Sequence, residues 1–277
     1  MDSYYGNTVY TDEFMYEVMQ IYELPKYLYH YTSIETFALI LKNNTLRFNR
    51  LDKVNDVNEA ISFNFPYANT AVFTSSWTSH KDESIPMWRL YTQNMDGVRI
   101  KLPVNMFKGR KNPHVFEKGG SRIQHDEAVT IKRKKLEYKF HTSGIQGPNK
   151  IHYTNDKELL QKEVLCNQEG YISTSLYDLG MFKQKCWEYE QEWRFKILAF
   201  FEEFNLPNDE FTNKVLDLKT YPIMNTFIDV PLESGIFNEA ELILGPKTTQ
   251  GQYIILESLV EKYSPNAKIR RSRLQLR

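Results

Sequence analysis

The stretch CWEYEQEWRFKIL, Cys186–Leu198, constrains the fold more than any other part of the chain. Most of its apolar residues recur at every second position, which is the period of a half-buried β-strand. On the same period Glu190, Glu192 and Arg194 share one face of that strand. Adjacent carboxylates repel each other unless a cation compensates, and Arg194 is the local cation. We therefore expect a strand over residues 187–200 whose charged face either meets solvent or lines a cleft.

Helical and strand-forming patterns alternate irregularly along the rest of the chain. Apolar residues at three- and four-residue spacing predict helices over 11–23, 33–44, 84–94, 155–183 (with a further start at Ser175) and 250–263. Alternating β-formers predict strands over 27–32, 45–50, 71–78, 96–103 and 239–246, with 204–229 as a loop and 267–276 as a strand or tail. Such an order is not that of a doubly wound sheet. It predicts an α+β protein, one domain over 1–277, with a mostly antiparallel sheet.

Composition limits the function classes. Acidic and basic residues balance at 35 each, which gives no overall attraction to nucleic acids or anionic membranes but leaves room for a local basic groove. The two cysteines, Cys166 and Cys186, have no metal-binding or disulfide-scaffold spacing, which favours a reducing compartment. The N-terminus lacks the features of a signal peptide, and no long apolar window occurs. We expect a cytoplasmic protein without membrane contact.

Two polar clusters lie in the first part of the chain. His30, within LYHYTS, is either a histidine satisfied inside the core or a hydrogen-bonding group for a ligand. The run RFNRLDKVNDVNE contains Arg47, Asn55, Asp56 and Glu59. The ordinary explanation for Asn55 and Asp56 is turn chemistry, because both residue types form Asx turns.

Two further clusters follow along the chain. Ser75 and Ser76 stand at the end of a predicted strand, and Trp88 and Tyr91 lie one helical turn apart. Trp88 can equally be a core residue covered by Tyr91. The basic run KRKK, within 108–150, is either a solvated surface or a phosphate contact. No P-loop, dinucleotide fingerprint, HExxH or GxSxG motif occurs.

The order of these motifs resembles a bacterial family catalogued as domain of unknown function 2971. Its members carry an IL-x-N-x-x-L-R-F core, here ILKNNTLRFNR, and an N-D-p-x-E loop, here VNDVNEA. They also carry m-W-x-x-Y followed by G-x-x-i-x-f, here MWRLY and DGVRIKL, and W-x-x-E-x-E-W-R, here WEYEQEWR. The resemblance covers roughly residues 27–198, and Val57 stands where proline is usual. The family name carries no activity.

A second likeness is to NAD-dependent ADP-ribosyltransferase domains, including the DNA-targeting toxins. It rests on a strand with His-Tyr-Thr, followed by a helix and the L-R-F run. The resemblance implies an ADP-ribosyltransferase-like fold, in which a mostly antiparallel, split sheet is flanked by helices. Those enzymes use a histidine or arginine on the first strand, a tyrosine or serine in the middle and a glutamate on a late strand. The chain offers, in that order, His30, then Tyr91 or Ser75/Ser76, then Glu190 or Glu192.

The resemblance also implies roles for these residues. A glutamate would stabilise the oxocarbenium-like charge that develops as the nicotinamide–ribose bond breaks, with Glu192 preferred because Glu190 lies nearer the strand start. Tyr91 would stack on nicotinamide, and Arg47 or Arg194 would meet the pyrophosphate. The predicted catalytic residues are Glu192, Glu190, His30 and Tyr91. The predicted NAD-binding residues are His30, Tyr31, Thr32, Arg47, Asn55, Ser75, Ser76, Trp88 and Arg194.

Three functional hypotheses remain open from the sequence. The first is an ADP-ribosyltransferase-like enzyme, a toxin or phage-defence effector that modifies nucleic acid or protein; it requires His30 and Glu192 to reach one ligand. The second is a Mg²⁺-dependent nuclease built on Asp56, Glu59, Glu190 and Glu192 with Lys196 nearby, although the usual Glu-x-Lys run is absent. The third is a non-enzymatic module, whose polar residues form a buried network or bind a nucleotide.

Overall fold

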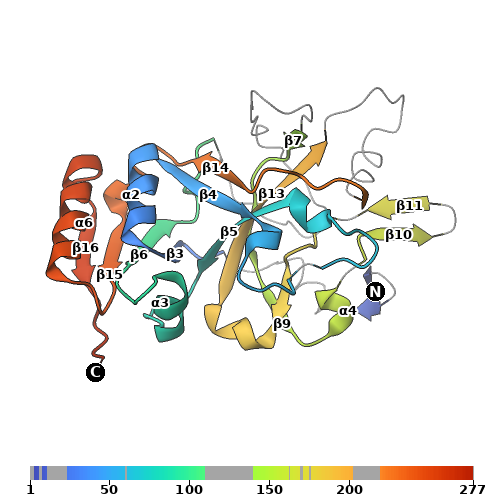
Figure 1. Ribbon diagram of the computed structural model, residues 1–277, viewed down its shortest axis with the longest axis horizontal. Helices are drawn as coiled ribbons and strands as arrows, with labels where there is room; N and C mark the ends of the chain where they lie inside the picture. Colours follow the sequence, from blue (N-terminus) through green and yellow to red (C-terminus); the bar gives the residue numbers. More distant parts are fainter. Residues whose placement is uncertain are drawn as a thin grey trace.

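The structure is a computed structural model that describes residues 3–5, 8–10, 24–59, 61–109, 140–161, 163–168, 171–174, 176–201 and 219–276. Its main feature is a ten-stranded, mostly antiparallel sheet that does not close (Figure 1). The strands run in the order β14-β4-β5-β3-β6-β15-β16, and β13 joins the other side of β5 and also pairs with β7 and β8. This arrangement confirms the predicted α+β class. The predicted helix over 11–23 lies outside the described residues.

The strands of the large sheet are β3 (Tyr27–Thr32), β4 (Thr45–Arg50), β5 (Val72–Thr78), β6 (Val98–Pro103), β7 (Phe140–Thr142), β8 (Gln146–Lys150), β13 (Glu192–Phe201), β14 (Phe227–Pro231), β15 (Glu241–Leu244) and β16 (Lys268–Arg271). Smaller pairs are β1 (Ser3–Tyr5) with β2 (Thr8–Tyr10), β9 (His152–Thr154) with β12 (Phe182–Gln184), and β10 (Leu165–Gln168) with β11 (Tyr171–Thr174). The α-helices are α2 (Ile34–Asn43), α3 (Ile85–Tyr91), α4 (Lys157–Leu160) and α6 (Gln250–Tyr263). None of the described helices is long and apolar enough to cross a membrane.

The predicted strand–helix–strand opening is confirmed, and local chemistry explains it. Ser33 caps α2 by accepting the backbone N–H of Thr36 at 3.1 Å. Asn44 ends the helix in the left-handed conformation, at φ 51°, so that β4 starts at the next residue. The first three regular elements therefore follow from short-range signals alone.

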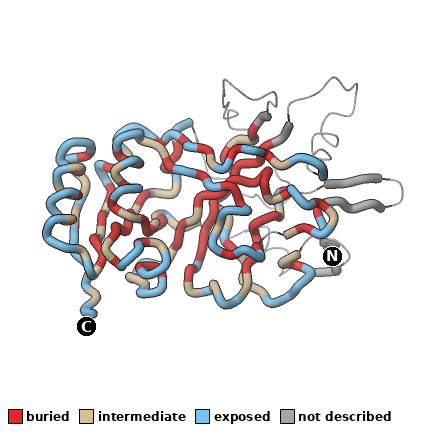
Figure 2. The backbone as a smooth tube through the Cα atoms, viewed as in Figure 1, coloured by how far each residue is buried: buried red, intermediate tan, exposed pale blue. Residues whose placement is uncertain are grey.

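The two faces of the sheet are covered differently. Leu28, Ile100 and Leu242 point into the main core, where they join Phe37 of α2 and Leu256 of α6. We call this side the α2/α6 face; Figure 2 shows that buried residues run along the strands through the middle of the molecule, while α2 and α6 are largely exposed or intermediate on their outer sides. The alternate residues of the same strands point to the opposite side, which we call the α3 face.

The sheet is split beside the middle of β5. On one side β13 pairs with β5 from Val72 to Thr78. On the other side β4 pairs only with Phe73 and Thr74, and β3 pairs only with Thr78. In the register of the described strands, residues 75–77 therefore have no partner on that side. This gap between β3 and β4 positions the site described below.

Three sequence predictions differ from the structure because tertiary pairing overrides local pattern. Among the described residues of the predicted helix over 155–183 only Lys157–Leu160 is α-helical, and β12 pairs in parallel with β9 instead. The strand predicted from residue 187 begins at Glu192, because Lys185–Glu190 forms a 3₁₀ helix that ends in a left-handed Gln191. The predicted loop over 204–229 lies outside the described residues up to 218, and its last three residues belong to β14, which pairs with β4.

Gly97 lies immediately before β6, where the backbone packs closely against Thr32. An added Cβ there would lie 2.2 Å from the Thr32 carbonyl oxygen, whereas at Gly251 in α6 the nearest atom, Thr249 Oγ1, is 3.9 Å away. We expect Gly97→Ala to lower the free energy of unfolding by about 1–3 kcal/mol, because the backbone must shift. Gly251→Ala should change it by less than about 1 kcal/mol, in the stabilising direction. Urea denaturation of both variants measures the difference, and equal effects would contradict this packing.

Candidate functional site

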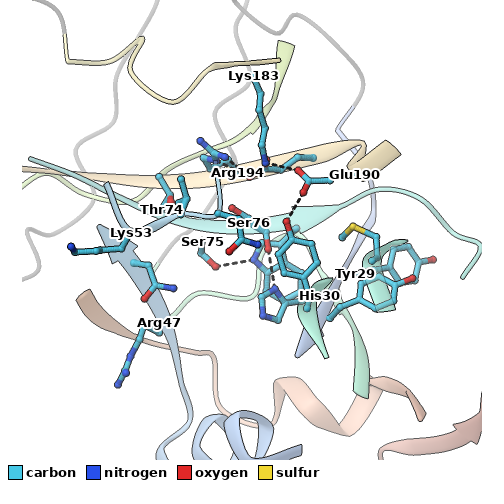
Figure 3. Close-up of a pocket in the computed structure, with 18 residues that line it drawn as sticks. Tyr29, His30, Arg47, Lys53, Thr74, Ser75, Ser76, Lys183, Glu190 and Arg194 are labelled. Carbon is cyan, nitrogen blue, oxygen red and sulfur yellow. Dashed lines mark hydrogen bonds and ion pairs between the residues drawn. The ribbon is translucent and has the colours of Figure 1, made fainter. Parts of the chain in front are cut away.

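A cleft of about 220 Å³ opens at the split between β3 and β4 (Figure 3). Most of the predicted site residues line it, although they come from β3, β4, β5, α3, the 3₁₀ helix Lys185–Glu190 and β13. These residues are His30, Tyr31, Arg47, Asn55, Ser75, Ser76, Tyr91, Glu190, Glu192 and Arg194. The fold therefore gathers side chains that are up to 164 positions apart, from His30 to Arg194, around one space.

Arg194 is the best-buried charge beside the cleft. Its side chain is 1% exposed, and its Nε donates to Glu192 Oε1 at 2.8 Å. Its Nη1 donates to a Glu59 carboxylate oxygen and to the Gly180 carbonyl oxygen, the latter at 2.8 Å. Arg194 is thus held between two carboxylates and is not free to reach a ligand with these donors.

Lys183 continues the network toward the cleft. Its Nζ donates to Glu190 Oε2 at 2.5 Å and to Glu192 Oε2 at 3.2 Å. Glu190 Oε1 accepts a hydrogen bond from the Tyr91 hydroxyl. Carboxylates and cations therefore alternate, which offsets the cost of burying them. We call this series the ion chain; its members are Glu59, Arg194, Glu192, Lys183, Glu190 and Tyr91.

Burial and charge act differently along the ion chain. Burial acts to raise the pKa of Glu192, but the charges of Arg194 and Lys183 outweigh it and hold that pKa at about 2. Burial raises the pKa of Glu59 and of Glu190, and their cationic neighbours oppose this only in part. Glu192 is therefore the most firmly ionised carboxylate, and Glu190 is the one that more readily takes a proton.

His30 sits at the split itself. Its Nδ1 lies 2.9 Å from the Ser76 carbonyl oxygen, which can only accept, so Nδ1 carries the hydrogen. Burial lowers the pKa of His30, with the Ser76 hydrogen bond opposing, and the neutral ring leaves Nε2 as an acceptor. The ring packs on Trp77 at a centroid distance of 5.1 Å. The imidazole thus takes the place of a missing strand partner for β5.

His30 and Glu192 start from opposite faces of the sheet. His30 alternates with Tyr29 along β3, and Tyr29 shares the α3 face with Glu192 through their common partner Thr78. In a continuous sheet the two side chains would be separated. The split removes that barrier, and both residues line the same cleft.

Arg47 and Asn55 lie at the outer part of the cleft. Arg47 binds Asp229 through Nε at 2.8 Å and Nη2 at 3.0 Å, and its guanidinium lies 3.6 Å from the centre of the Phe227 ring. In Figure 3 its side chain points away from Ser76 and His30. Arg47 is therefore committed to β14, which does not favour the predicted pyrophosphate contact. Asn55 is exposed, whereas Asp56 accepts the Asn58 N–H at 3.0 Å and forms the expected Asx turn.

Two of the predicted NAD-binding residues do not line the cleft. Trp88 is fully buried in a small cluster with Tyr31 and Met87, and its Nε1 donates to Glu83 at 3.1 Å. Thr32 is 7% exposed and lies beyond the cleft on β3. The cleft therefore does not favour a ligand contact for either, and Trp88 follows the alternative core interpretation.

The carboxylates do not converge as the nuclease hypothesis requires. Among the described residues no group of three or more acidic, histidine or cysteine side chains is placed to share a metal ion. Glu59 faces Arg194, and Asp56 serves its own turn. Lys196 points to the carbonyl oxygens of Tyr177 and Leu179. The arrangement favours charge pairing over metal ligation.

Lys183 is the main residue that the sequence analysis missed. It lies in the segment predicted as helix, so its position beside Glu190 and Glu192 was not expected. One signal could have found it: Arg194 compensates a single carboxylate, so a second buried carboxylate requires another cation from elsewhere. Glu59 was considered only as a metal ligand, and its pairing with Arg194 depends on a contact across 135 positions.

One family profile matches the chain. It is described as "Protein of unknown function (DUF2971)" and covers residues 87–195. The match includes MWRLY and WEYEQEWR, and it confirms the resemblance to that family over these residues. Comparison with curated proteins and with solved structures gives no match.

The buried Arg194 can be compared with the exposed Arg47 by the same substitution. We expect Arg194→Met to lower the free energy of unfolding by about 3–5 kcal/mol, because Glu59 and Glu192 are left buried without their partner. Arg47→Met should cost less than about 1 kcal/mol, since the side chains of Arg47 and Asp229 are 48% and 38% exposed. Denaturant unfolding measures both. Similar losses for the two variants would show that the ion chain does not carry the buried charge as described.

The low pKa of Glu192 predicts how the free energy of unfolding depends on pH in acid. Above its ordinary pKa of 4.5 both the folded and unfolded forms are ionised, so its stabilising contribution is complete. As the pH falls from 4.5 to about 2 the unfolded form takes up the proton first, and the contribution is lost. As the pH falls over this range, the free energy of unfolding should decrease more steeply for the wild type than for Glu192→Gln. The two slopes should differ by up to about 1.4 kcal/mol per pH unit, which corresponds to one proton. Parallel curves would contradict the low pKa.

Proposed function

We propose that the cleft binds NAD and breaks its nicotinamide–ribose bond, as in ADP-ribosyltransferase-type enzymes. The observation that carries the proposal is the split sheet, which lets His30 of β3, Ser76 of β5 and the Glu190/Glu192 pair line one cleft. The sequence alone did not show whether these groups lie near one another. The proposal extends to an ADP-ribosyltransferase-like fold, which the split and mostly antiparallel sheet supports.

The cleft has the chemical groups that this reaction needs. Tyr29, Tyr91 and Trp77 supply aromatic walls for a planar ring. His30 Nε2 offers an acceptor for a ribose hydroxyl. As the C1′–N bond breaks, nicotinamide leaves with the bonding electrons and positive charge develops on the ribose, which nearby carboxylates stabilise. Two carboxylates of the ion chain, Glu190 and Glu192, line the cleft and are held there by Lys183 and Arg194.

Glu190, rather than Glu192, is better suited to face the ligand. Glu192 already accepts from Nε and Nη2 of Arg194 and from Lys183, which fills most of its acceptor capacity. Glu190 accepts from Lys183 and Tyr91 and keeps lone pairs for a ribose hydroxyl. Its raised pKa also makes it the better acceptor for the proton that an attacking nucleophile releases. Glu192 would then position Arg194 and Lys183.

A nucleotide-binding module without turnover is the second candidate. The observation that favours it is that the hydrogen-bonding groups of Glu192 and Arg194 are already occupied by protein partners. Such pairing is typical of a structural network more than of a reactive group. On this alternative Glu190 and His30 bind a ligand, but no bond breaks.

NAD binding and nicotinamide release separate these proposals. We expect the wild type to bind NAD by calorimetry and to release nicotinamide. Glu190→Gln should retain binding but lose turnover by about 10²-fold or more. Glu35→Gln, an exposed change in α2, is the matched control and should keep both. Binding without release by the wild type would support the second candidate, and no binding would sink both.

A further inference from the structure

We propose that the α3 face beside the cleft binds single-stranded nucleic acid. The surface is formed by Lys26, Tyr27, Lys101, Lys268 and Arg270, which we call the cationic track. The inference rests on the proposed function in one respect, since it names nucleic acid as the acceptor of the transferred group. The binding itself requires no NAD and is tested without it.

Strand register places Tyr27, Lys101, Lys268 and Arg270 on one face, and Lys26, just before β3, reaches it through its contact with the Tyr27 ring. Lys268 of β16 pairs with Glu241 of β15, Glu241 with Lys101 of β6, and Lys101 with Tyr29 of β3. Paired residues share a face, and the intervening positions of these strands carry the core residues of the α2/α6 face. The row therefore runs across the sheet from its edge strand to β3. In Figure 1 these strands lie side by side between α6 and the centre of the sheet.

The charges on this row are mostly positive and reach solvent. Lys26 and Lys268 are exposed, Lys101 is half-buried and the Arg270 side chain is 54% exposed. The row contains one carboxylate, Glu241. Its Oε1 lies 3.8 Å from Nη1 of Arg270, which makes a weak ion pair. Although the chain has no net charge, it thus places several lysines and an arginine around this one carboxylate. A polyanion complements this surface.

Tyr27 makes a nucleic acid a better fit than an acidic protein. Two ammonium groups lie over its ring, Lys26 Nζ at 5.4 Å and Lys101 Nζ at 4.6 Å from the centroid. Binding of single strands combines a positively charged surface for phosphates with aromatic rings for bases. The half-buried Tyr27 and its two lysines supply both within one site, because the flexible lysine side chains can turn to the phosphates and leave the ring to a base. Duplexes hide their base faces, so the unpaired form is the one this arrangement suits.

The track leads into the cleft. Tyr29 lies two residues from Tyr27 on the same face and lines the cleft, with the Arg99 guanidinium 4.1 Å from its ring centre. A strand held on Tyr27 and Lys101 would therefore present its next nucleotides near Glu190. This continuity is what connects the docking surface to the proposed reaction.

Two double variants with equal charge change test the proposal. Lys101→Glu/Lys268→Glu reverses charge on the track, and Lys42→Glu/Lys262→Glu reverses it on exposed positions of α2 and α6 across the sheet. The probes are fluorescein-labelled 20-nucleotide single-stranded DNA and RNA, followed by anisotropy at several salt concentrations. We expect the track variant to bind at least tenfold more weakly, with a shallower salt dependence, while the α2/α6 variant binds like the wild type.

A second pair of variants tests the stacking contact without changing charge. Tyr27→Leu should weaken binding about tenfold, whereas Tyr27→Phe should leave it unchanged, because only the ring face is needed. Melting temperatures of all variants report whether the fold survives. The proposal is overturned if the wild type binds neither probe at low salt, or if both charge-reversal variants lose affinity equally. It is also overturned if an acidic peptide competes fully and Tyr27→Leu has no effect, which would make the partner a protein.

Discussion

A buried guanidinium must have its hydrogen-bond acceptors, and the arrangement around the cleft depends on that requirement at Arg194. Its acceptors come from β13 itself, from Glu59 in the loop after β4 and from the Gly180 carbonyl. Gly180 has φ +72°, and a Cβ there would lie 2.9 Å from Arg194 Nη1, so this turn approaches the arginine only as glycine. Three segments far apart in the sequence are thereby fixed around one charge. Lys183, three residues after Gly180, is brought to Glu190 by the same contacts.

The second constraint is the divergence of β3 and β4 from β5. A strand with an unpaired middle leaves backbone groups that need partners, and His30 supplies one by donating to the Ser76 carbonyl. The cleft is therefore a consequence of sheet geometry and not of a flexible loop. Because the opening passes between strands, it collects side chains from both faces, such as Trp77 and Glu192. A continuous sheet could not bring those groups to one ligand.

The elements that the sequence predicted well are those specified by neighbouring residues. Ser33 and Asn44 mark the ends of α2, and the alternation in 45–50 specifies β4, so no distant contact was needed. The site was predictable in its residue types but not in its connections. The position of Lys183 depends on the parallel pairing of β12 with β9, and the 3₁₀ helix before β13 ends at Glu190, whose side chain pairs with that lysine. Both are long-range effects that outweigh local periodicity.

The balance of charge over the whole chain conceals a separation of charge within it. Strand alternation places acids and bases on particular faces, and pairing between strands then sorts them into rows. Glu190 and Glu192 line the cleft together with the cations Lys183 and Arg194, while Lys101 and Lys268 lie on the neighbouring strands and Lys26 just before β3. On the proposed reaction this order is productive, since positive charge develops on the ribose and negative charge belongs to the acceptor backbone. The carboxylates would then stabilise the ribose as it becomes positive, and the lysines would hold the phosphates of the acceptor strand.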